Sequence, residues 1–168
     1  MTPIVFVVGV PRSGTGWAQK ILLAHHETVP FDAQDEETGL FLQYPRDEAL
    51  RLIEERLVPG KVMVEKTPRH LGYLDYILEG TEGSVILMHR DLYSTVKSYR
   101  MRWPRTPPEN VSGLWHYSHQ VQQELRRHPR VLTMDYNALV RDFNQCHLQM
   151  LTFCGLPYVP PIPEILPK

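Results

Sequence analysis

The amino-acid sequence predicts an α/β fold in which helices flank a central parallel sheet of four or five strands. Two observations predict this class. Apolar runs of strand length recur along the chain, and segments with the periodicity of amphipathic helices separate them. This alternation is typical of a parallel sheet covered on both faces. With 168 residues, the chain has the size of one domain with its own hydrophobic core.

Each predicted strand is a short run rich in β-branched residues. The first, IVFVVG, is apolar throughout, which is the pattern of a strand buried on both faces. Thr67-Pro68 ends the second, because proline cannot continue the ladder of hydrogen bonds. The predicted strands cover 4–9, 61–66, 84–90 and 130–134.

Helical periodicity and end signals place the helices between these strands. Pro129 and Gly155 mark the ends of the last two. The Pro-containing stretch 105–113 is predicted to be an exposed loop, and the last thirteen residues, five of them proline, to run extended over the surface. We therefore expect one domain, 1–168, with a core at 1–158 and a Pro-rich tail at 159–168. The predicted helices cover 14–26, 47–57, 70–80, 93–103, 114–127 and 136–155.

Composition argues against several classes of partner. The net charge is −1, so the chain has no overall basic field to attract nucleic acid. It has neither the ~20 consecutive apolar residues of a membrane span nor a basic-then-apolar leader, so we expect no membrane partner and a cytoplasmic location. Met1 lies three residues before the first strand, which leaves open that this is a domain of a larger protein.

The cysteines and histidines do not predict a disulfide or a metal site. Cys146 and Cys154 lie eight residues apart on one predicted helix, a rise of about 12 Å, which is too long for a disulfide. We expect reduced, buried thiols. The histidine pairs have no carboxylate or cysteine at metal-ligand spacing, so no metal is predicted; these pairs are His25 with His26 and His116 with His119.

The segment GVPRSGTG, between the first strand and the first helix, has the glycine spacing of a phosphate-binding loop. Thr15 and Gly16, however, stand where the common form of this loop has Lys and Ser/Thr. This argues against an ATP or GTP phosphotransferase that uses magnesium. Backbone N–H groups and the positive end of the helix still suit a phosphate or sulfate. The side chains that can add to them are Arg12, Ser13 and Thr15; the alternative is a simple tight turn.

Two further strand ends carry polar side chains, namely Glu65–Pro68 and Arg90. The carboxyl ends of parallel strands meet at one edge of the sheet, where ligands bind. Arg90 and Ser98 lie eight residues apart and can hold one phosphate together. Arg90 could instead cap a helix or pair with Asp91.

Four segments in this order resemble the sulfotransferases that use 3′-phosphoadenosine 5′-phosphosulfate (PAPS). GVPRSGT is similar to their 5′-phosphosulfate loop, and RDLYSTVKS to their 3′-phosphate site. VEKTP resembles the second-strand segment of glycan sulfotransferases. DYNALVRDF and LTFCGLPY resemble the closing helix of the family. The resemblance runs from Ile4 to about Tyr158.

The resemblance implies PAPS as donor of a sulfuryl group, a hydroxyl-bearing acceptor and no metal. Arg90 and Ser98 would hold the 3′-phosphate. Arg12 would replace the missing lysine and Lys66 would reach the transferring group. The residues implied at the 5′-phosphosulfate are Arg12, Ser13, Gly14, Thr15, Gly16 and Trp17.

For the general base, the resemblance of DEET to a segment of tyrosylprotein sulfotransferases implies Glu37, with Glu36 as its neighbour and substitute. Glu65 is the rival. Glu65 and Lys66 should alternate across the strand end, so that one of them points at the site, and the resemblance favours Lys66. A solvated acidic turn is the alternative for Glu36 and Glu37, and a surface salt bridge for Lys66.

The sequence departs from the family pattern in ways that leave two other functions open. Gly16 stands where a second threonine is common, and the glycine- and lysine-rich loop that covers the cofactor in many members is absent. A non-catalytic nucleotide-binding module is therefore one alternative, and a small-molecule kinase another. Trp103 and Trp115 either pack or line an acceptor groove. The arginines that could compensate for the loop, or meet an acidic acceptor, are Arg100, Arg102 and Arg105.

Overall fold

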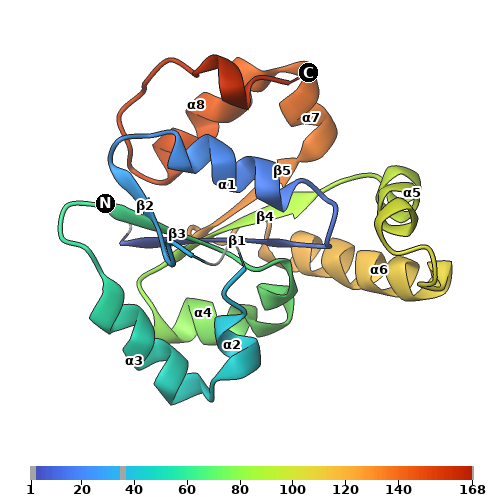
Figure 1. Ribbon diagram of the computed structural model, residues 1–168, viewed down its shortest axis with the longest axis horizontal. Helices are drawn as coiled ribbons and strands as arrows, with labels where there is room; N and C mark the ends of the chain where they lie inside the picture. The colour runs from blue at the N-terminus through green and yellow to red at the C-terminus, as the bar shows by residue number, and fades with distance from the viewer. Residues whose placement is uncertain (1–2, 35–36, 168) are drawn as a thin grey trace.

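Five parallel strands form the centre of the molecule, in the order β2-β3-β1-β4-β5 (Figure 1). The structure is a computed structural model that describes residues 3–34 and 37–167. The sheet confirms the predicted fold class. Its strands are β1 (Ile4–Gly9), β2 (Thr28–Pro30), β3 (Val62–Lys66), β4 (Ser84–His89) and β5 (Val131–Asp135).

The central strand, β1, is buried on both faces, as its sequence predicts. Val5 and Val7 face one hydrophobic cluster, and Ile4, Phe6 and Val8 face the other. β1 lies at the centre of the sheet, with β2 and β3 on one side of it and β4 and β5 on the other. The chain crosses from the first side to the second between β3 and β4. The loop that follows β1 therefore lies at the switch point, where open α/β sheets bind ligands.

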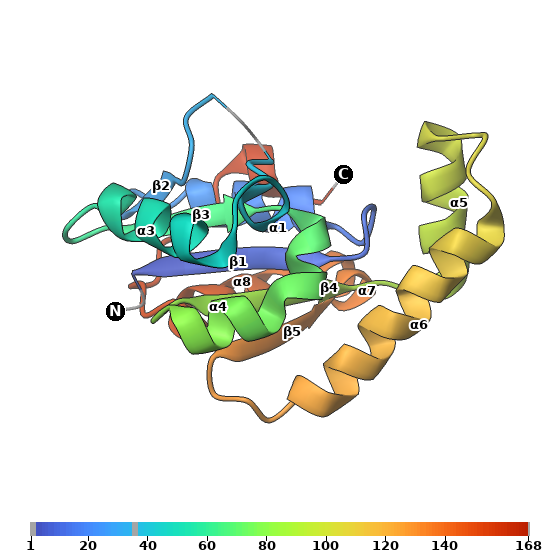
Figure 2. The same cartoon turned by 90° about the horizontal axis from the view of Figure 1, so that it is seen from below.

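Helices cover both faces of the sheet (Figure 1). One face carries α1 (Thr15–Leu23), α7 (Tyr136–Arg141) and α8 (Phe143–Phe153). The other carries α2 (Leu40–Gln43), α3 (Arg46–Arg56), α4 (Leu74–Gly80) and part of α6 (Pro108–Leu125). Figure 2 shows α5 (Leu92–Arg102) against the first turns of α6, at the opposite end of the molecule from α3.

Three predictions of secondary structure were wrong or incomplete. β2 and α2 were missed because three and four residues are too few to show a period. The predicted loop 105–113 is helical from Pro108, because proline in the first helical turn lacks only an N–H that the helix does not use. The predicted helix 136–155 breaks at Asp142, whose backbone is not helical and whose carboxylate accepts from the N–H of Gln145 and so caps α8.

The Pro-rich tail contains more structure than an extended segment. It forms a short 3₁₀ helix, η2 (Pro163–Ile165), in which Ile165 is buried among the residues of α1 and α8. The indole Nε1 of Trp17 donates to the carbonyl oxygen of Ile165 at 2.8 Å. This tail therefore packs on the first helix.

Cys146 and Cys154 are free and buried, as expected. Burial raises the pKa of the Cys154 thiol to about 12, so this thiol stays protonated at physiological pH. Within residues 3–34 and 37–167, none of the helices combines the length and the apolar character that crossing a membrane requires.

Candidate functional site

The loop after β1 has the backbone of an anion-binding loop. Arg12 and Gly14 both have positive φ, of 79° and 102°, and the N–H of Ser13 closes a turn onto the carbonyl of Val10 at 2.9 Å. Helix α1 begins directly after this turn, and its first N–H groups have no acceptor within the helix. These groups and the helix dipole favour a phosphate or sulfate at this point.

Gly14 is where the loop needs a glycine. A Cβ at Gly14 would lie 2.5 Å from Cδ2 of Tyr136, in addition to the strain of its positive φ. Gly16, two residues later, is in helical conformation, and nothing lies within 4 Å of a Cβ built on it. The two glycines therefore differ in what an added methyl group would do.

We expect Gly14→Ala to lower the free energy of unfolding by about 1–3 kcal/mol, because alanine strains this backbone and displaces Tyr136. Gly16→Ala is the matched control: alanine favours helix, so stability should stay equal or rise by up to about 1 kcal/mol. Urea denaturation of both variants measures the difference. Equal stability of the two would contradict the account of Gly14.

Arg90 follows β4 and points at the loop from the neighbouring strand. Its guanidinium lies 4.2 Å from the ring centroid of Tyr136, and its Nη1 donates to the carbonyl oxygen of Arg12 at 3.4 Å. Its Nε is buried and has no hydrogen-bond partner among the described residues. A buried guanidinium N–H without an acceptor is costly, so this position suits an anionic ligand.

Asp91 does not serve Arg90 as its partner in a close ion pair. Its carboxylate accepts from the N–H of Ser94 at 2.8 Å and from Nδ2 of Asn137 at 3.2 Å, and so caps α5. The hydrogen bond from Ser94 holds the pKa of this carboxyl below its usual value. The contribution of the Asp91 carboxylate to stability is therefore present above the pKa that this group has in the unfolded chain. It is lost as the pH falls through the lower pKa of the folded protein.

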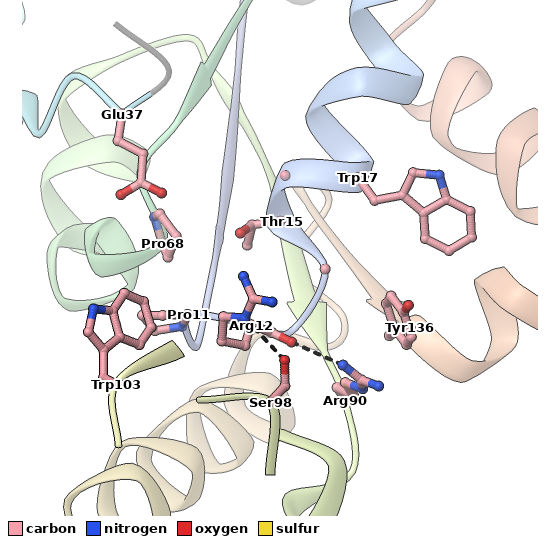
Figure 3. Close-up of a pocket in the computed structure, with 12 residues that line it drawn as sticks. Pro11, Arg12, Thr15, Trp17, Glu37, Pro68, Arg90, Ser98, Trp103 and Tyr136 are labelled. Atoms are coloured by element: carbon pink, nitrogen blue, oxygen red, sulfur yellow. Dashed lines mark hydrogen bonds between the residues drawn. The ribbon is translucent and has the colours of Figure 1, made fainter. Parts of the chain in front are cut away.

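Ser98 lies on α5 and reaches the same place. Its hydroxyl oxygen accepts from Nε of Arg12 at 3.1 Å. Two cations and one hydroxyl, from three elements, thus lie around the first turn of α1 (Figure 3).

These side chains line a pocket of about 310 Å³. Figure 3 shows Trp17, Tyr136 and Arg90 on one side of Arg12, and Glu37, Pro68 and Trp103 on the other. The predicted site residues that the pocket brings together are Arg12, Gly14, Thr15, Gly16, Trp17, Glu37, Arg90 and Ser98.

Ser13 and Lys66, two other predicted site residues, do not line the pocket. The hydroxyl of Ser13 is buried beneath the loop, near Gly9, and has no partner among the described residues. Lys66 is 5% exposed and reaches the edge of the pocket, where its Nζ lies 2.8 Å from Oε1 of Glu37. Glu36, the neighbour predicted as a substitute for Glu37, lies outside the described residues.

Glu65, the rival base, is fully buried. Its Oε1 accepts from the hydroxyls of Thr38 and Thr67, at 2.8 and 2.7 Å, and its Oε2 lies 3.0 Å from Nδ1 of His70. The N–H of Phe41 donates to Nε2 of His70, so Nδ1 carries the proton and donates to Glu65. This network connects the end of β3 to the segment that carries Glu37.

Tyr136 was not predicted as a lining residue, whereas Pro68 lies at the end of the predicted strand-end segment Glu65–Pro68. Tyr136 directly follows β5, so the rule applied to the other strand ends would have found it. Trp103 lines the pocket, while Trp115 packs: its ring stacks on His119 and its Nε1 donates to the carbonyl oxygen of Arg90. Among the residues described, no three His, Cys, Asp or Glu side chains are grouped to hold a metal ion.

Comparisons with known proteins point to one family. A family model described as "Sulfotransferase family" matches residues 30–160. No curated protein sequence matches the chain.

Solved structures share the fold. The sulfotransferase domain of the olefin synthase of Synechococcus PCC 7002 aligns with a TM-score of 0.69 at 17% identity, over 94% of this chain and 74% of that one. A sulfotransferase domain from the curacin biosynthetic pathway aligns with a TM-score of 0.69 at 19% identity, over 98% of this chain and 77% of that one. Mouse sulfotransferase SULT7A1, complexed with PAP (3′-phosphoadenosine 5′-phosphate), aligns with a TM-score of 0.66 at 14% identity, over 94% of this chain and 60% of that one. At such identities the likeness concerns the fold.

Proposed function

The chain belongs to the sulfotransferase family, and we propose that it transfers a sulfuryl group from PAPS to a hydroxyl acceptor. One observation carries the proposal. The first turn of α1 and the buried Nε of Arg90, which has no partner among the described residues, offer two separate anion positions in a single pocket. A donor with phosphate groups at two ends suits such a pocket better than a single phosphate does.

We assign the phosphosulfate to the loop and the 3′-phosphate to the Arg90 side. The loop would bind through the N–H groups of Gly14, Thr15 and Gly16, the hydroxyl of Thr15 and the guanidinium of Arg12. Arg90 and Ser98 would bind the 3′-phosphate, with Nε of Arg90 gaining the acceptor that it lacks. Ser13 would support the loop from beneath, and the ring of Trp17 would bound the pocket beyond Gly16.

PAPS, when bound, supplies a sulfuryl group with a good leaving group, 3′-phosphoadenosine 5′-phosphate (PAP). The acceptor oxygen forms a bond to sulfur as the bond from sulfur to the leaving phosphate oxygen breaks, and the acceptor's proton must be removed. Arg12 and Lys66 would neutralise the charge that develops on the leaving phosphate. Glu37, on the other side of the pocket, would take the proton.

Calorimetry with PAP tests the donor assignment. PAP should bind, and ATP with magnesium should bind much more weakly, because only PAP has a 3′-phosphate for Arg90. Binding of ATP with magnesium in preference to PAP would move the proposal to a kinase. Binding of PAP without turnover across a broad range of acceptors would leave the non-catalytic module.

A second expectation concerns metal ions. Because Arg12, Lys66, Arg90 and a helix N-terminus supply the positive charge, EDTA should leave PAP affinity and turnover unchanged. The same assays, repeated with added magnesium, provide the measurement. Activity that EDTA removes and magnesium restores would overturn the assignment of these cations.

A further inference from the structure

We propose that the acceptor is an anion: a ring-shaped hydroxyl compound whose carboxylate or sulfate group is held by Arg102 and Arg105 while its hydroxyl lies near Glu37. This inference rests on the proposed function of the pocket and names the class of acceptor that the pocket takes.

The first observation is a local excess of positive charge. Residues 92–107, which comprise α5 and the turn after it, contain four basic residues and no acidic residue, in a chain whose net charge is −1. All four side chains are exposed, and none makes an ion pair with another described residue. These residues are Lys97, Arg100, Arg102 and Arg105.

The arginines of α3 differ from these four residues in their partners. On α3, Arg46, Arg51 and Arg56 each lie within 3.4 Å of a carboxylate oxygen. Arg126 and Arg127 are also exposed without an ion pair among the described residues, so the absence of a partner is not special to this segment. What distinguishes residues 92–107 is that they bring four basic residues together without an acidic one. A negatively charged ligand would supply the counter-charge.

The second observation joins this charge to the pocket. Trp103 lines the pocket on the side of Glu37 and Pro68 (Figure 3). Arg102 precedes it in the chain and lies one helical turn after Ser98, so it is on the side of α5 that meets the pocket. The N–H of Thr106 bonds to the carbonyl of Trp103 at 3.1 Å and closes a turn that contains Arg105.

The lining of this side suits a ring. The indole of Trp103 is 43% exposed and rests on Tyr99, with ring centroids 4.5 Å apart. Together with Pro68 it offers flat apolar surface next to a carboxylate that can take a proton. Arg102 and Arg105 flank Trp103 in the chain, so a ring against Trp103 with its hydroxyl towards Glu37 would leave a charged substituent for these two arginines to bind.

These arginines are less suited to the donor. The 3′-phosphate is assigned to Arg90 and Ser98, and Trp103 lies on the opposite side of Arg12 from Arg90 (Figure 3). Removing Arg102 and Arg105 should therefore change acceptor use and leave PAP affinity within about two-fold, apart from the weak long-range effect of two exposed charges.

Three phenols that differ only in charge test the proposal: 4-hydroxyphenylacetate, its neutral amide, and tyramine. We expect kcat/KM to be about ten-fold higher for the anion than for the amide at low salt, and lowest for tyramine, as for close pairing of exposed charges. High salt should reduce this preference. In Arg102→Gln/Arg105→Gln the anion and the amide should be used about equally.

Arg126→Gln/Arg127→Gln is the matched control, because it removes the same charge from the far end of α6 and should keep the preference. Affinity of the three phenols for the PAP-bound protein, measured by calorimetry, gives a second measure that needs no turnover. Equal use or equal binding of the three phenols by the unaltered protein overturns the inference, while PAP binding leaves the proposed function intact. The inference is also overturned if the preference for the anion survives in Arg102→Gln/Arg105→Gln, or if this variant loses PAP affinity.

Discussion

Replacing Glu37 with glutamine is expected to lower turnover by about 10²–10⁴-fold and to leave PAP affinity within a few-fold. The amide keeps the shape of the side chain but cannot take the acceptor's proton. Glu37 is suited to this role because its side chain is 56% exposed and lies on the side of the pocket away from Arg90, and among the described residues it makes an ion pair with Lys66 alone. Steady-state kinetics with one good acceptor, together with calorimetry on PAP, measures both quantities.

The ion pair with Lys66 makes a second comparison informative. Lys66→Met removes the cation and leaves the carboxylate, so it should slow turnover through poorer stabilisation of the leaving phosphate rather than through loss of the base. The pH profile separates the two roles. The limb of the profile that reports ionisation of the base should persist in Lys66→Met and disappear in Glu37→Gln.

Glu65 and Glu36 complete the set of carboxylates. Glu65→Gln should act mainly on stability, because Glu65 is buried and each of its oxygens already accepts a hydrogen bond. Its effect on rate should be smaller than that of Glu37→Gln, and Glu36→Gln should be mild. If only Glu65→Gln abolishes turnover in a folded protein while Glu37→Gln is silent, the end of β3 supplies the base.

The strand ends explain why much of this pocket could be predicted from the sequence. Arg12 and Arg90 directly follow short apolar runs, and parallel strands bring such positions together whatever the details of the helices. Ser98 was found differently, by its spacing of eight residues from Arg90, which places it about two turns into the next helix, and by the resemblance of this segment to the 3′-phosphate site of the family.

Contacts between distant parts of the chain could not be predicted in this way. The hydrogen bond from Trp17 to Ile165 joins residues 148 positions apart, and no local pattern encodes it. The pairing of Lys66 with Glu37 depends on the segment after β2, a strand of three residues that shows no period. The alternation of Glu65 and Lys66 was predicted, but the hydrogen bond from Thr38 to Glu65 joins residues 27 positions apart, whereas Thr67 and His70 are near Glu65 in the chain.

Replacing Arg90 with alanine is expected to weaken PAP binding by about 2–4 kcal/mol, or roughly 30- to 1000-fold, as when one partner of a buried, charge-assisted pair is removed. AMP, which lacks the 3′-phosphate, should bind with nearly the same affinity as before. The difference between the two ligands is the informative quantity, because Arg90 also contacts Tyr136 and the carbonyl of Arg12. A general disturbance of the loop would weaken both ligands equally.

Two further variants make the comparison sharper. Arg100→Ala removes the same charge from an exposed position of α5 outside the pocket and should leave PAP affinity nearly unchanged. Arg90→Lys keeps the charge but loses the two-pronged geometry, so it should recover only part of the affinity for PAP. Calorimetry with PAP and AMP on all three proteins decides the assignment. If Arg90→Ala weakens PAP and AMP alike, Arg90 supports the loop, and the 3′-phosphate is bound elsewhere.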